Sequence, residues 1–174
     1  NPAISRIIHA MLTRLITVLI LPLLAFPVLA DWYREEAAIM GTAVAVELWA
    51  GDEARGRALA QSALDEIRRI DRLMSTYRPD SELSGINARA AAQAVAVGDE
   101  LRSLIGQALA YSVTTDGAFD ITYASAGQHY DYRAGRKPGA DQLADILSAI
   151  DYRHVVLDEG VGTIRFLHPG VRID

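Results

Sequence analysis

The chain has 174 residues, of which 51% are hydrophobic and 22% charged, and its 17 basic and 22 acidic side chains give a formal net charge of −5 at pH 7. An acidic chain without a basic stripe lacks the electrostatic footprint of a nucleic-acid-binding protein. Cysteine is absent, which excludes disulfides, thiolate metal sites and a cysteine nucleophile.

The N-terminal residues carry the pattern of a targeting segment. Arg14 precedes an uncharged stretch over residues 15–29 with small residues at its end, which predicts a secretory signal peptide over residues 11–30 and upstream sequence over residues 1–10. A retained membrane anchor is the alternative, because the stretch is only slightly short for a membrane span. We therefore expect the chain from residue 31 onward to be periplasmic or attached to the periplasmic face of the inner membrane.

Two periodic patterns follow this segment. Residues 43–49 place three aliphatic side chains on one face, which predicts a half-buried strand. Gly41, just before it, indicates a bulge or a close backbone approach. Apolar residues that recur every three or four positions predict a helix over residues 51–74. Its predicted core stripe consists of Leu59, Ala63, Ile67, Ile70 and Met74.

A proline sets the end of this helix. Pro79 fixes its own φ, lacks an N–H donor and disfavours helical geometry at the preceding residue. Either Asp80 or Ser81 then caps a second, short helix that ends at Ile86 and Asn87. Asn87 either closes this helix in a left-handed conformation or links it to the preceding loop.

Tyr77 lies between the two helices, in the segment Ser75–Ser81 that we call the Tyr77 loop. An aromatic ring beside hydroxyls and an arginine, on a loop held by helices at both ends, suits the gripping of a flat ligand. The commoner role of a loop tyrosine is to cap a hydrophobic core. On the residues alone, both interpretations stay open.

The remaining elements are short. We expect strands over residues 93–97, 155–157 and 162–167 and from residue 171, and helices over residues 99–114 and 141–150. Asp99 is the expected N-cap of the first of these helices. Its predicted core stripe consists of Leu101, Leu104, Ile105, Ala108 and Ser112. The inward side chains of the second helix are predicted to be Leu143, Ile146, Leu147 and Ile150.

The segment between these helices has two parts. Thr115–Thr122, which we call the Asp120 turn, contains the turn signal Asp116-Gly117. Phe119 is most simply a core ring and Asp120 a cap or an acceptor for backbone donors. Residues 123–133 lack a regular period and are expected to form a long loop. Because hairpins and isolated helices alternate without βαβ spacing, we predict an α+β fold with a mainly antiparallel sheet and packed helices.

Three blocks of the chain resemble one known family. Met40-Gly41-Thr42, Met74–Asn87 and the Asp120 turn occur in the order typical of the ApbE family, the FAD:protein FMN transferases, and the resemblance extends from about Met40 to the last residue. It implies an ApbE-like fold and an FAD site. The residues it implies for FAD binding are Met40, Tyr77, Ala118, Phe119 and Asp120.

The resemblance also implies an activity. Such an enzyme cleaves the pyrophosphate of FAD and transfers FMN to a threonine hydroxyl of a periplasm-facing electron-transfer protein, with release of AMP and with the help of Mg²⁺. No catalytic or metal-binding residue is assigned to this chain, because the family's metal site is expected beyond Asp174. We accordingly expect residues 31–174 to be the N-terminal part of the transferase domain, incomplete at the C-terminus and inactive alone.

Two other functions remain open at this point. One is a periplasmic FAD-binding protein without transferase activity. The other is an FAD pyrophosphatase that passes the phosphoryl group to water. A firmly gripped FAD favours the first of these over the second, because a hydrolase must release its product easily.

Overall fold

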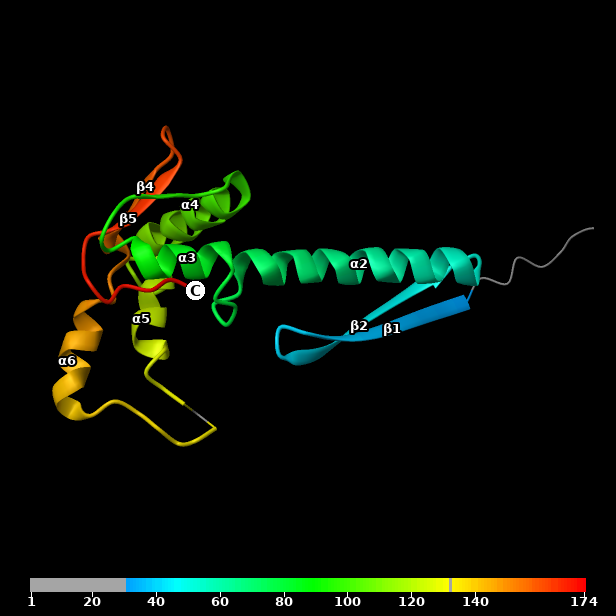
Figure 1. Cartoon of the computed structure of the whole chain (residues 1–174), viewed down its shortest axis with the longest axis horizontal. Helices are drawn as coiled ribbons and strands as arrows, with labels where there is room; N and C mark the ends of the chain where they lie inside the picture. The colour runs from blue at the N-terminus through cyan, green and yellow to red at the C-terminus, as the bar shows by residue number, and fades with distance from the viewer. Residues whose placement is uncertain (1–30, 132) are drawn as a thin grey trace, which may run out of the picture. The chain divides into compact units, whose positions relative to one another are not determined.

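The computed structural model describes residues 31–131 and 133–174, so the predicted signal peptide lies outside the described residues (Figure 1). The described chain divides into two compact units. One comprises residues 31–37 and 44–64, and the other comprises Ala38–Ala43 and Asp65–Asp174. Within the described ranges, no helix combines the length and the apolar character needed to cross a bilayer.

The described part of the chain starts with a β-hairpin. Strands β1 (Asp31–Ile39) and β2 (Thr42–Ala50) are joined by a two-residue turn, Met40-Gly41, in which both residues have left-handed backbone, with φ of 54° and 71°. Two consecutive residues with positive φ define the hairpin turn whose twist matches that of the strands. The expected bulge or close approach at Gly41 is therefore wrong, because this glycine serves the turn and a Cβ there would meet nothing within 4 Å.

Helix α2 (Glu53–Met74) confirms the predicted helix. Its predicted core stripe is wrong in the first half, where Leu59 is 47% exposed. The helix turns a different face inward because Gly56 lies against the ring of Tyr33, where a Cβ would stand 2.4 Å from ring carbons. The buried residues of this helix are Gly56, Ala60 and Leu64.

A three-stranded antiparallel sheet forms the centre of the second unit. Its order is β3 (Val95–Ala96), β5 (Thr163–Phe166) and β4 (Val155–Asp158). The pairing places Val155 opposite Phe166 and Val95 opposite Ile164. These pairs confirm the predicted hairpin near the C-terminal end and the antiparallel α+β fold.

Four helices and two 3₁₀ turns accompany this sheet in the described part of the second unit. They are α3 (Glu82–Arg89), α4 (Asp99–Thr114), the 3₁₀ turn η2 (Ile121–Tyr123), α5 (Ala124–Gly127), α6 (Ala140–Ser148) and the 3₁₀ turn η3 (Tyr152–His154). One hydrophobic core joins α3 and α4 to the sheet, with Ile86, Ile164 and Phe166 at most 1% exposed. Full burial of such side chains contributes about 1.5–3 kcal/mol each. This core is the scaffold on which the neighbouring loops are fixed.

The start of α4 differs from the prediction. Gly98, not Asp99, is the N-cap, because its backbone is extended and its carbonyl accepts from the Arg102 N–H at 2.9 Å. Its own N–H donates to Glu82 Oε1 at 2.6 Å. Asp99 instead lies in the first turn and pairs with Arg102 at 2.8 Å. The predicted stripe holds at both ends of the helix but not at Leu104, which is 50% exposed.

The segment after the Asp120 turn is more ordered than predicted. Residues 123–127, predicted as part of a long loop, form the end of η2 and all of α5. Asp131 pairs with Arg136 in an isolated antiparallel bridge. The guanidinium of Arg136 also lowers the pKa of the Asp131 carboxyl through a hydrogen bond. On α6 the predicted inward position of Leu147 is wrong, because this side chain is 51% exposed.

An exposed ion-pair network joins α2 to the start of α4. Arg69 donates to both carboxylate oxygens of Glu66 and of Glu100, at 2.7–2.9 Å. These hydrogen bonds lower the pKa of both glutamates and raise that of Arg69. All three side chains are substantially solvated. The network therefore orients the end of α2 and the start of α4 toward each other but adds little to the stability of the fold.

Two glycine substitutions test the packing of α2. Gly56→Ala is expected to destabilise the protein, because its Cβ would overlap the Tyr33 ring. Gly106→Ala in α4 is the matched control, because its Cβ would meet neighbours only at ordinary contact distances of 3.5 and 3.6 Å, and the change should stabilise by about 0.5–1 kcal/mol. Thermal and denaturant unfolding measure both effects. Equal stabilisation by the two variants would contradict the close approach at Gly56.

Candidate functional site

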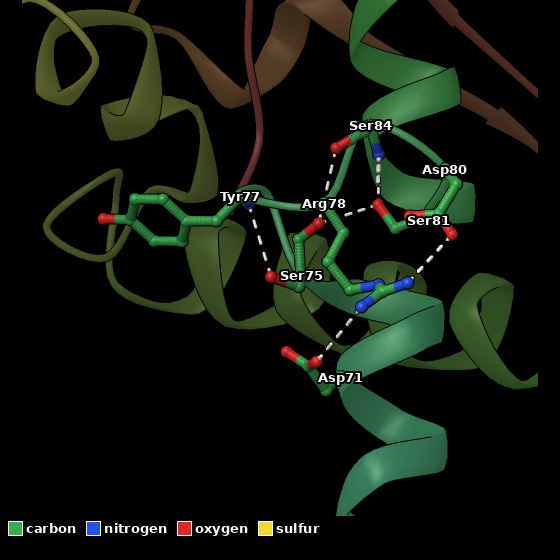
Figure 2. A network of polar contacts seen from close by, with 7 residues as sticks. All are labelled: Asp71, Ser75, Tyr77, Arg78, Asp80, Ser81 and Ser84. Carbon is green, nitrogen blue, oxygen red and sulfur yellow. Dashed lines mark hydrogen bonds and ion pairs between the residues drawn. The ribbon is translucent and has the colours of Figure 1, made fainter. Parts of the chain in front are cut away.

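The base of the Tyr77 loop is closed by three serines (Figure 2). Ser81 is the N-cap of α3, and its Oγ accepts from the Ser84 N–H at 3.0 Å and donates to the Ser75 carbonyl at 2.7 Å. The Ser84 hydroxyl donates to the same carbonyl at 3.3 Å. Of the two predicted candidates, Ser81 is therefore the cap, and it also ties the end of α2 to the start of α3.

Arg78 holds the outer part of the loop. Its Nη2 donates to Asp80 Oδ2 at 2.9 Å, and its Nη1 lies 3.9 Å from Asp71 Oδ2 on α2 (Figure 2). The hydrogen bond from Arg78 lowers the pKa of the Asp80 carboxyl, and a backbone hydrogen bond within Asp80 adds to the effect. The loop backbone is thus fixed on both sides of Tyr77.

Tyr77 itself projects away from this network. Its N–H donates to Ser75 Oγ at 3.3 Å, while its side chain is 96% exposed (Figure 2). The interpretation of this ring as the cap of a core is therefore wrong in the part of the chain that the structure describes. A rigid loop that presents an aromatic ring to solvent suits a stacking contact with a flat ligand.

The Asp120 turn has the predicted backbone. Asp116 and Gly117 both have positive φ, 50° and 79°, and the Gly117 N–H donates to the Ser112 carbonyl at the end of α4. Two residues after Gly117, the Phe119 N–H donates to Thr115 Oγ1 at 3.0 Å. The chain reversal after α4 is thus closed by local hydrogen bonds.

Phe119 is not a core ring. It is 46% exposed and packs edge-on against Tyr111, with 6.4 Å between ring centroids and an interplanar angle of 75°. Such edge-to-face pairs are favourable beyond the area they bury. Ala118 beside it is also exposed, so this part of the turn offers an apolar surface.

Asp120 uses both carboxylate oxygens within the protein. Its Oδ1 accepts from the N–H and the hydroxyl of Thr122, at 2.8 and 2.6 Å, and its Oδ2 accepts from the Tyr152 N–H at 2.8 Å. This confirms its interpretation as a cap and a backbone acceptor. Its implied contact with FAD stays a prediction, as do those of Ala118 and Phe119.

Asp174 brings the two predicted segments together. Its N–H donates to the carbonyl of Ile121 at 3.3 Å, and its Oδ1 lies 3.5 Å from the hydroxyl of Thr76. Thr76 precedes Tyr77, and Ile121 follows Asp120. The Tyr77 loop and the Asp120 turn therefore meet at one residue.

The segment before Asp174 is not the predicted strand. Asn87 Nδ2 donates to the Ile173 carbonyl at 3.0 Å, and Asn87 Oδ1 accepts from the Ile173 N–H at 2.9 Å. Ser125 Oγ accepts from the Arg172 N–H at 2.9 Å. Side chains thus replace the neighbouring strand. Asn87 lies inside α3 without positive φ, so its interpretation as a left-handed helix end is wrong. Its link to the Tyr77 loop stays a prediction, because its side chain binds the C-terminal segment and not the loop directly.

A cavity of about 180 Å³ opens beside this meeting point. Its walls come from the end of α2, from α3 and α4, and from Ile121 and Ile173, and they are mostly apolar. Leu104 lines it, which accounts for the exposure of a residue predicted to be in the core. The carboxylate of Asp174 is the charged group of the lining.

Met40 lies at the hairpin turn, where it is 52% exposed and has a φ of 54°. A left-handed backbone is uncommon for a residue with a long side chain. Its implied contact with FAD stays a prediction.

The described residues form no metal centre. No three His, Cys, Asp or Glu side chains among residues 31–131 and 133–174 lie together as ligands of an ion. His154 and His168 stack at 5.1 Å without such a third partner. The residues present therefore do not fit the Mg²⁺ that the resemblance implies, and we assign it no ligand in this chain.

The contacts of three residues in this region were not predicted from the sequence. Thr76, Asn87 and Asp174 connect segments that are far apart in the chain, with 86 positions between Asn87 and Ile173. One signal was available, because asparagine is unfavourable inside a helix and its presence there indicates a side-chain partner.

Comparisons with known proteins identify the family of this chain. Residues 40–174 match the ApbE family, and the chain belongs to this family. An FAD:protein FMN transferase of Klebsiella pneumoniae is 26% identical over 144 residues, which are 82% of this chain and 44% of the relative. One of Treponema pallidum is 26% identical over 153 residues, which are 82% of this chain and 41% of the relative.

A solved structure shows the same fold. The ApbE protein of Thermotoga maritima superposes with a TM-score of 0.73 at 26% identity, over 83% of this chain and 47% of that protein. The chain thus spans about half the length of the relatives it matches.

Two substitutions separate the ring of Tyr77 from the loop that carries it. Tyr77→Ala should leave stability within about 0.5 kcal/mol of wild type, because an exposed side chain is lost. Ser81→Ala should cost about 1–2 kcal/mol, because it removes the α3 cap and the bond to Ser75. Denaturant unfolding measures both. A large loss of stability in Tyr77→Ala would show that the ring packs on the protein.

Proposed function

We propose that the protein is an FAD:protein FMN transferase. Membership of the ApbE family and the names of the two relatives support this proposal. The single observation that carries it in the structure is the exposed ring of Tyr77 on a loop fixed by serine and arginine hydrogen bonds. Such a ring lies where an aromatic ligand can stack at little entropic cost.

In the proposed reaction, a threonine hydroxyl of the acceptor protein attacks the phosphorus of the FMN half of FAD. The bond from this phosphorus to the bridging oxygen of the pyrophosphate breaks, a bond to the threonine oxygen forms, and AMP leaves. The hydroxyl proton passes to solvent or to a base. The reaction is a phosphoryl transfer, in which positioning and charge stabilisation dominate.

In this proposal the described residues bind and orient FAD. Tyr77 and Phe119 offer exposed aromatic surface to the flat rings of FAD, and Met40 offers a flexible apolar one. Asp120 holds the turn that carries Phe119 by accepting from Thr122 and Tyr152. These contacts bind FAD and restrict its movement during transfer.

Mg²⁺ dependence belongs to the proposal as well. The ion would neutralise charge on the pyrophosphate and on the leaving phosphate. The described residues include no ligand set for this ion.

We further propose a periplasm-facing electron-transfer protein as acceptor. The support is the signal-like pattern of residues 11–30, because a chain exported by such a segment would face the periplasm.

The test uses cells that carry a deletion of the gene. Covalent flavin is read as in-gel fluorescence of the envelope proteins, with and without the full-length wild-type gene. The proposal predicts a fluorescent band that the wild-type gene restores and that Tyr77→Ala weakens by about tenfold, the loss expected when a stacking contact of roughly 1–1.5 kcal/mol is removed. Tyr77→Phe is the matched control, because it keeps the ring, and it should restore the band.

The purified full-length protein separates the remaining functions. With FAD, Mg²⁺ and the labelled envelope protein, AMP should form in equal amount to covalent flavin. AMP without labelled protein would identify a pyrophosphatase, and bound FAD without AMP would identify a flavin-binding protein. A protein that binds no FAD would refute all three.

A further inference from the structure

Asn87 makes an unusual contact for a residue inside a helix. Its side-chain amide both donates to and accepts from the backbone of Ile173, at 3.0 and 2.9 Å. This is the pattern by which a neighbouring strand would satisfy one residue, and it uses the donor and the acceptor of the amide together. An alanine, a serine or a leucine at this position would leave the Ile173 N–H or carbonyl without this partner.

The peptide that Asn87 holds is the one immediately before Asp174. The side chain of Ile173 is 2% exposed and belongs to the hydrophobic core. Its backbone is thus fixed from one side by packing and from the other by the Asn87 amide. As a result, the position of Asp174 follows from that of α3, which carries Asn87.

Asp174 in turn lies between the two segments of the candidate flavin site. Its N–H donates to the Ile121 carbonyl, and its carboxylate lies 3.5 Å from the Thr76 hydroxyl. Each of these partners is adjacent in sequence to a residue implied in FAD binding, Asp120 in one case and Tyr77 in the other.

We propose that Asn87 is a positioning residue of the flavin site, which acts through Ile173 and Asp174 to fix the spacing between the Tyr77 loop and the Asp120 turn. The inference rests on the proposed function, because FAD is the ligand that this spacing serves. Asn87 does not touch the ligand in this proposal. Its effect on binding passes through Asp174 and Thr76.

The first arm of the test measures FAD affinity in the full-length protein by fluorescence titration. Asn87→Ala should raise the Kd of FAD by about tenfold, the change expected from the loss of about one net hydrogen bond. Ile164→Val is the control matched for stability. It trims a fully buried side chain in β5 and should lower the Tm without changing the Kd.

The second arm is a double-mutant cycle. If Asn87 had a merely structural role, its substitution would show no coupling to a substitution at Thr76. If Asn87 acts through Asp174 on Thr76, Thr76→Val should weaken FAD binding in wild type but add nothing in the Asn87→Ala background. Asn87→Asp keeps an acceptor for the Ile173 N–H but sets a carboxylate oxygen against the Ile173 carbonyl, so its Kd should rise at least as far as that of Asn87→Ala. Asn87→Asp also replaces Asn87→Ala in this test if Asn87→Ala does not fold.

Each outcome decides the inference. Wild-type affinity in Asn87→Ala, additive effects in the cycle, or an equal loss in Ile164→Val would overturn the positioning role while the proposed function stands. A wild-type protein that binds no FAD would instead refute the proposed function, and the positioning role with it.

Discussion

The pairing of Asn87 with the backbone of Ile173 is the contact on which the arrangement of the candidate site depends. A buried peptide group must find a hydrogen-bond partner, and no described strand lies beside Ile173 to supply one. The amide on α3 meets this need, and Ser125 does the same for Arg172. Through these two side chains the C-terminal segment is held against the helices, and Asp174 reaches both the Tyr77 loop and the Asp120 turn.

The site divides its work between polar and aromatic side chains. Ser81, Arg78 and Asp120 use their hydrogen bonds within the protein, on backbone groups or on a neighbouring side chain, so they fix geometry. Tyr77 and Phe119 make few such contacts and remain exposed. A surface of this kind is preorganised for a flat ligand, which reduces the entropy lost on binding.

Local signals in the sequence predicted much of the fold. Pro79 ended α2 as expected, Asp116-Gly117 formed the turn, and the strands near residues 155–166 paired as a hairpin. In each case the information lies within a few residues, because proline geometry, positive φ and alternation are local properties. The same is true of Ser81, whose cap follows from its position before α3.

Features set by distant partners were not predictable. The inward face of α2 follows from the approach of Tyr33 to Gly56, and Glu82 on α3 holds the N–H of Gly98, the residue that caps α4. The extended segment at residues 171–174 has strand composition but binds side chains instead. Of the candidate site, the resemblance supplied the aromatic and turn residues. It did not supply the links through Asn87 and Asp174, which depend on the tertiary fold.

The most direct test of a shared flavin site is hydrogen exchange of the full-length protein with and without FAD. Peptides from the Tyr77 loop and the Asp120 turn should gain protection together at the same FAD concentration, while the β4–β5 hairpin at residues 155–166 stays unchanged. Protection of only one of the two segments, in a protein that binds FAD, would contradict the claim that they form one site.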